Sequence, residues 1–154
     1  MTRTLIHSRD HAAHGVPSVS ELGPGAQLVL CAARSWHAGE VKGAASPCAL
    51  FRCAGMASDA FAAFASLLSL LSACPSAPGF GALHDASLTD GEEGLLSALA
   101  ALQEGEPWRA QRVVADWGPP AAAPRAIGLL AVIARCFAGA GLPLSTQPLH
   151  PVLH

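Results

Sequence analysis

The sequence predicts an all-α protein, a small irregular bundle of five or six helices with extended or mobile termini. Alanine, with 32 residues, and leucine, with 21, dominate the apolar fraction of 51%, and both are strong helix formers. Valine and isoleucine together contribute 11 residues and tyrosine is absent, so residues that favour strands are scarce. Glycine and proline divide the chain into segments of helical length.

The 154 residues are enough for one domain with its own core. We divide them into a polar, histidine-rich arm at 1–20, a helical domain at 21–142 and a proline-rich tail at 143–154. The arm is compatible with a short helix or with disorder. The tail, "LPLSTQPLHPVLH", carries three prolines and is predicted to be extended along the bundle or mobile, because proline disrupts helices.

The first half of the helical domain predicts three helices. One is expected over 25–38, where Gly39 ends it, and a shorter one over 47–54. The third, over 58–74, is apolar on most of its surface, so we expect it at the centre of the bundle. Ser58 is its predicted N-cap.

The second half predicts a helical hairpin over 89–117 and a last helix that begins at Pro124. Thr89 and Glu92 have the spacing of a capping box at the start of the hairpin. Its second helix begins with "PWRAQ", with proline at the first helical position, where it is favoured. Trp117 is interpreted as a core anchor.

The chain has few charges for its size. Charged residues make up 13% of the sequence, against roughly 25% in soluble proteins in general. We infer that a partner, a second copy or a ligand covers part of the surface; the alternative is a weakly polar surface of alanine, serine and glycine. The net charge of −2 and the nine scattered basic residues argue against a nucleic-acid partner, which requires a dense basic face.

The expected location is the cytoplasm, with no membrane partner. Residues 1–20 lack the apolar segment of a secretory signal. We find no run of about 20 apolar residues that would span a bilayer. The five cysteines form an odd number without a disulfide-like pattern, which is typical of a reducing compartment.

The stretch "HSRDHAAH" is the candidate metal site. It contains His7, His11 and His14, which would lie on one face of a helix and could bind Zn²⁺, Ni²⁺ or Cu²⁺. No second group of residues is evident that would fix the three imidazoles. We therefore interpret the stretch as a polar arm with no cofactor, and keep the metal site as the alternative.

Two clusters combine tryptophan with arginine near a helix end. Such side chains dominate the energetics of protein–protein interfaces, and arginine also binds carboxylates and phosphates. A simpler interpretation of the first cluster is a helix C-terminus with cations that favour its dipole. The candidate partner-binding residues are Arg34, Trp36 and His37 in the first cluster, and Trp108, Arg109 and Arg112 in the second.

No catalytic motif is evident: glycine-rich phosphate loops, GxSxG and HExxH are all absent. The predicted function is therefore a non-catalytic interaction protein, meaning a small adaptor, regulatory subunit or assembly factor, with a protein partner or a homodimer. The alternative is a small-molecule or metal-binding helical protein with an apolar pocket between helices or a histidine-based site. An enzyme is less expected but is not excluded, since distant residues can converge.

Overall fold

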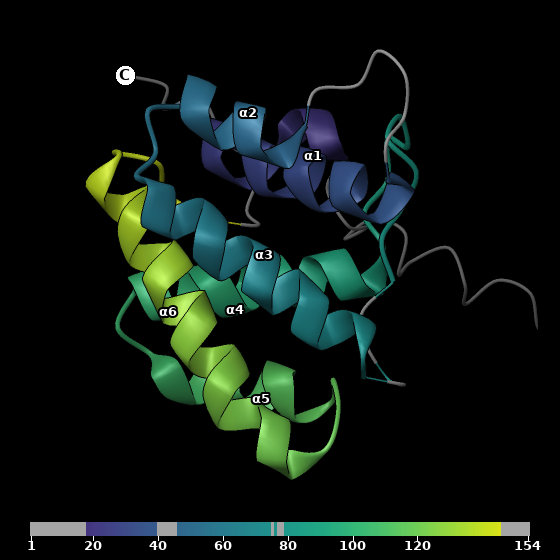
Figure 1. Ribbon diagram of the computed structural model, residues 1–154, viewed down its shortest axis with the longest axis vertical. Helices are drawn as coiled ribbons and strands as arrows, with labels where there is room; N and C mark the ends of the chain where they lie inside the picture. The colour runs from purple at the N-terminus through teal and green to yellow at the C-terminus, as the bar shows by residue number, and fades with distance from the viewer. Residues whose placement is uncertain (1–17, 40–45, 75, 77–78, 146–154) are drawn as a thin grey trace, which may run out of the picture.

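The computed structural model describes residues 18–39, 46–74, 76 and 79–145. Within these ranges the chain forms six α-helices and no strand (Figure 1), which confirms the predicted all-α fold. The helices are α1 (Pro24–Ala38), α2 (Pro47–Cys53), α3 (Ser58–Ser72), α4 (Asp90–Gln103), α5 (Pro107–Ala115) and α6 (Ala123–Gly139).

The helices begin and end close to the predicted residues because their signals are local. Thr89 and Glu92 form the predicted capping box at the start of α4, and proline occupies one of the first positions of α5. One expectation was wrong: the N-cap of α3 is Ala57, which makes no side-chain cap hydrogen bond, and Ser58 is the first residue of the helix. Asp59 in that first turn is favourable to the helix dipole.

The bundle is built around α3, α4 and α6 (Figure 1). Helix α6 packs most extensively on α3 and also contacts α4 and α5, while α4 packs closely on α5. Helices α1 and α2 contact each other on one side of the molecule, and α5 lies at the opposite end. The apolar α3 thus lies near the centre, as its composition predicts.

Three phenylalanines join α2 to the centre of the bundle. The ring of Phe51 on α2 meets Phe64 on α3 and Phe137 on α6 edge-on, with centroids 5.0 and 5.8 Å apart. All three side chains are buried. Edge-to-face packing of this kind is favoured by the charge distribution of aromatic rings, so this contact fixes the short α2 against two longer helices.

The segment after α6 is extended and packs across α1 and α4. The side-chain amide of Gln103 donates to the carbonyl of Leu142 and accepts from the backbone N–H of Leu144, at 3.2 and 2.7 Å. Gly25 on α1 allows this close approach, because a Cβ there would lie 2.8 Å from the carbonyl oxygen of Pro143. The buried side chain of Leu144 completes the contact.

The segment Pro120–Gly139, which includes α6, is 20 residues long and is apolar enough by composition to cross a membrane. This differs from our expectation that no segment reaches that length. In the structure one face of α6 packs against the other helices, and the remaining residues of the helix are partly or fully exposed. The outward face carries two exposed arginines, Arg125 and Arg135.

Candidate functional site

The predicted metal ligands His7, His11 and His14 lie outside the described residues. Within the part of the chain that the structure describes, no three histidine, cysteine, aspartate or glutamate side chains come together as a metal site. The metal site at His7, His11 and His14 therefore stays a prediction from the sequence.

Arg34 lies in the interior, which differs from the surface position that we expected. Its side chain is 3% exposed and forms an ion pair with the fully buried Glu92, with Nε 2.7 Å from Oε1. The guanidinium also donates from one terminal nitrogen to Oε2 of Glu92 at 2.9 Å. The contact is bidentate, the strongest geometry that arginine forms with a carboxylate.

The remaining donors of Arg34 bind the loop before α4. They donate to the carbonyl oxygens of Asp85 and Ser87, at 2.7 and 2.8 Å. Gly81 lies against the same guanidinium, since a Cβ there would be 3.1 Å from a terminal nitrogen of Arg34. Arg34 thus connects α1 to both the loop and the first turn of α4, and its hydrogen bonds are made within this chain.

Glu92 accepts hydrogen bonds from three directions. Besides Arg34, the backbone N–H groups of Gly81 and Thr89 donate to its two oxygens, at 2.8 and 2.9 Å. Burial alone would raise the pKa of this carboxyl group, but the hydrogen bonds from Arg34, Thr89 and Gly81 outweigh burial and lower the pKa below its ordinary value. The Glu92 hydrogen bond likewise raises the pKa of Arg34, so both groups stay charged.

Trp36 and His37 lie one turn further along α1, at a pocket of about 300 Å³. The wall opposite is formed by the end of α3 and by the chain that follows it, and the rings of His37 and Phe80 have centroids 6.1 Å apart. We call this the aromatic pocket; its lining residues are Trp36, His37, Leu68, Leu71, Ser72, Cys74 and Phe80.

The second predicted cluster lies on the surface of α5. Trp108 is 54% exposed and is the one large apolar side chain that is exposed among the described residues. The guanidinium carbon of Arg112 lies 6.0 Å from the centre of its ring, within reach of a cation–π contact. Arg109, in contrast, forms ion pairs with Glu104 and Glu106, which neutralise its charge.

Exposed side chains of α5, with the residue that caps its C-terminus, form one face, which we call the α5 face: Trp108, Gln111, Arg112, Ala115 and the capping Asp116. The opposite side of the helix is buried, including Trp117 just beyond its end, as predicted. Among the described residues neither Arg112 nor Asp116 forms an ion pair. Each therefore presents an unpaired charge to solvent.

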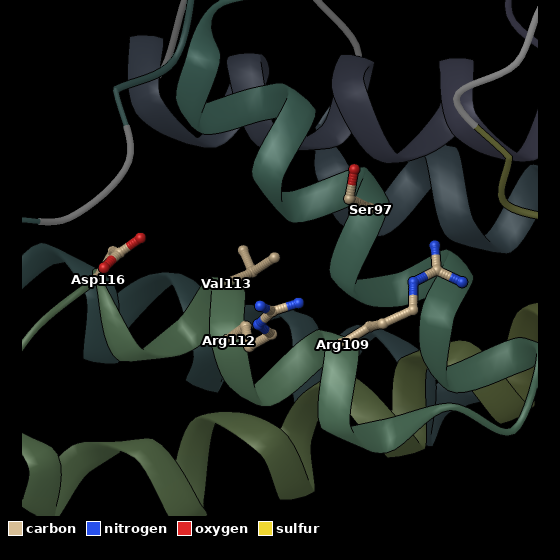
Figure 2. A pocket seen from close by; sticks show the side chains of 5 residues that line it. All are labelled: Ser97, Arg109, Arg112, Val113 and Asp116. Atoms are coloured by element: carbon tan, nitrogen blue, oxygen red, sulfur yellow. The ribbon is translucent and has the colours of Figure 1, made fainter.

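A surface pocket of about 350 Å³ borders the α5 face on the side of α4. Ser97 of α4 forms one wall, and the rest comes from Arg109, Arg112, Val113 and Asp116. Figure 2 shows Val113 close to the guanidinium of Arg112, with Asp116 further along the helix and Arg109 extending away from Arg112. A partner side chain that enters this pocket would contact the apolar Val113 and lie near the cation of Arg112 and the anion of Asp116.

Sequence reasoning missed three of the groups that define these regions: Glu92 as the partner of Arg34, Phe80 in the aromatic pocket, and Asp116 on the α5 face. One signal was available, since Arg34 is the only arginine, lysine or acidic residue in α1 and a charge on an apolar helix needs a buried partner. No local signal identifies Phe80, because loop residues reach the pocket only through the tertiary fold.

No family model matches this sequence, and comparisons with curated proteins and with solved structures found no match. The aromatic pocket and the α5 face are therefore the features from which a function can be proposed.

Proposed function

We propose that this protein is a non-catalytic interaction protein, a small adaptor, regulatory subunit or assembly factor of the cytoplasm, that binds a protein partner through the α5 face. The observation that carries the proposal is Trp108, exposed to 54% on a chain whose other described large apolar side chains are covered. An exposed tryptophan beside arginine is the composition of an interface hot spot. It is not the composition of an ordinary solvated surface.

The charges of the α5 face support the same function. Arg109 is neutralised by its own chain, but Arg112 and Asp116 are exposed and free to pair with groups on another molecule. Trp108, Arg112 and Asp116 are spaced four residues apart, so they follow one side of α5. A partner helix that lies along this side would contact an aromatic ring, a cation and an anion in sequence.

A second copy of the chain satisfies this pattern directly. If two α5 helices pair antiparallel about a two-fold axis, the guanidinium of one copy faces the carboxylate of the other, and the same contact occurs twice. The α5 face is self-complementary in this sense. A foreign protein with the same alternation of charge fits equally well.

The test begins with the molar mass in solution, by size-exclusion chromatography with light scattering over a range of concentrations. If the copies pair, Arg112→Asp and Asp116→Arg each shift the dimer toward monomer, and the double reversal in one chain restores it. Arg125→Asp, which reverses an exposed charge on α6, is the control and leaves the mass unchanged. A dimer that resists both single reversals would contradict pairing through the α5 face.

If the protein is monomeric at every concentration, the partner is foreign and the wild type is compared with Trp108→Ala in affinity capture. The proposal expects specific partners that are retained by the wild type and by Arg125→Ala but are lost with Trp108→Ala. Equal capture by all three proteins would show that the α5 face is not the contact.

A second candidate function is the binding of a small molecule in the aromatic pocket. Its volume of about 300 Å³ is at the lower end of the range for ligand sites. Its walls come from the ends of two helices and from the loop that contains Phe80.

A further inference from the structure

The hydroxyl and thiol hydrogen atoms in the aromatic pocket are already used by the chain, and the ring N–H groups of Trp36 and His37 are the other side-chain donors among the described lining residues. The hydroxyl group of Ser72 donates to the carbonyl oxygen of Leu68 at 2.8 Å, and the thiol of Cys74 donates to that of Leu70 at 3.3 Å. Ser72 and Cys74 therefore present only the lone pairs of their oxygen and sulfur atoms to a ligand. An anion would find neither hydroxyl nor thiol as a donor.

Two helices end at this pocket. Trp36 and His37 belong to the last turn of α1, and Leu71 and Ser72 to the last turn of α3. The C-terminus of a helix carries a partial negative charge that favours a cation. The last turn of α3 contains no basic residue, whereas the last turn of α1 contains His37. No lysine, arginine, aspartate or glutamate is among the described residues that line the pocket.

Aromatic rings add a second source of negative potential. Trp36, His37 and Phe80 line the pocket, and the face of a tryptophan or phenylalanine ring attracts a cation, most strongly for tryptophan. The side chains of Leu68 and Leu71 are buried and form an apolar surface between the two helix ends. Within the described residues the pocket thus combines apolar contact with negative potential and has no acidic side chain in its lining.

We infer that the aromatic pocket binds a small organic cation whose charge is surrounded by methyl or methylene groups, such as a quaternary ammonium compound. An inorganic cation does not fit the described lining, because none of the lining residues that the structure describes is a carboxylate. A neutral apolar ligand would leave the two helix ends and the ring faces without a charge partner. This inference rests on the second candidate function and is independent of the α5 face.

The test compares three probes of similar size by NMR titration at pH 8. They are choline, its uncharged isostere 3,3-dimethylbutan-1-ol, and butyrate. The readout is the indole N–H resonance of Trp36, assigned with Trp36→Phe. We expect choline to bind roughly tenfold more tightly than the neutral alcohol, the range of a cation–π contact, and butyrate to bind more weakly than either.

Two variants distinguish a cation site from a surface that binds apolar molecules nonspecifically. Ser72→Lys places a cation at the end of α3, where lysine favours the helix dipole, so the fold is retained while choline binding is lost. Phe80→Leu keeps the apolar volume and removes a ring, and should weaken choline but not the alcohol. Trp108→Leu, which removes the exposed ring of α5, is the matched control and leaves choline affinity unchanged.

Equal affinity for choline and the alcohol would overturn the cation inference while leaving a small-molecule pocket. Tighter binding of butyrate would overturn it in favour of an anion site. If the Trp36 resonance responds to none of the three probes, the inference and the second candidate function both fail, and the interaction function of the α5 face is unaffected.

Discussion

The two tryptophan–arginine clusters look alike in the sequence and occupy opposite environments in the structure. In the first, Arg34 is 3% exposed and is held by a fully buried carboxylate. In the second, Trp108 is 54% exposed and Arg112 lies beside its ring at the surface. The difference arises from what the rest of the fold brings to each arginine, since only Arg34 meets an acidic side chain from a distant helix.

The consequence is a division of roles. The buried pair joins α1 to α4 and to the loop between α3 and α4, so it contributes to the architecture. Among the described residues, Trp108 and Arg112 of the exposed cluster make no ion pair with another helix, and for this reason we propose them as partner-binding residues. Substitutions at equivalent places in the two clusters should therefore have different effects, in stability for the first and in binding for the second.

The largest expected effect follows from removal of Arg34. Arg34→Met leaves Glu92 charged and buried without its cation, and loss of one partner of a buried ion pair lowers the free energy of unfolding by about 3–5 kcal/mol. Urea denaturation followed by circular dichroism measures the change. Arg109→Met is the matched control, since Arg109 also forms ion pairs but at the surface.

We expect Arg109→Met to leave the denaturation midpoint essentially where it is in the wild type, because exposed ion pairs add little. If both arginine variants unfold at the same urea concentration, the interior and surface clusters would not differ as the structure shows.

A smaller difference is expected between the two tryptophans. Trp36 is partly buried and packs against the core, whereas Trp108 is largely in solvent. Trp36→Ala should lower the free energy of unfolding by about 1–3 kcal/mol through lost apolar contact, and Trp108→Ala by less than about 0.5 kcal/mol. The same denaturation experiment measures both, and a larger loss from Trp108→Ala would mean that its ring stabilises the fold.

The sequence was sufficient for the fold because the determinants of each helix are local. The capping box of Thr89 and Glu92 and the glycine at position 39 mark helix ends from neighbouring residues alone. Leucine and alanine patterns then decide which side of each helix is buried. The fold class and the extents of the helices could be predicted on this basis.

The candidate sites were only partly predictable because they depend on residues that are distant in the sequence. Arg34 and Glu92 are 58 positions apart, and the capping-box role of Glu92 concealed its second role as an ion-pair partner. The aromatic pocket likewise needs Phe80 beside His37. On α5, where the relevant residues are four apart on one helix, Trp108 and Arg112 were found from the sequence.

The smallest expected effect is a change in how stability depends on pH. Because the pKa of Glu92 is lowered in the folded chain, its contribution is complete above the pKa of a glutamate in the unfolded chain. That contribution is lost as the pH falls through the lower folded value. The net change is modest, since burial opposes the hydrogen bonds that lower the pKa.

We expect Arg34→Met to reverse the sign of the contribution that Glu92 makes to the pH dependence of stability. Without the guanidinium, burial dominates and raises the pKa of Glu92, so protonation favours the folded state as the pH falls. Urea midpoints between pH 7 and pH 3 should therefore decline less steeply for Arg34→Met than for the wild type, while Arg109→Met follows the wild type. Parallel profiles for all three proteins would mean that Glu92 stays ionised without Arg34, held by the backbone N–H groups of Gly81 and Thr89 alone.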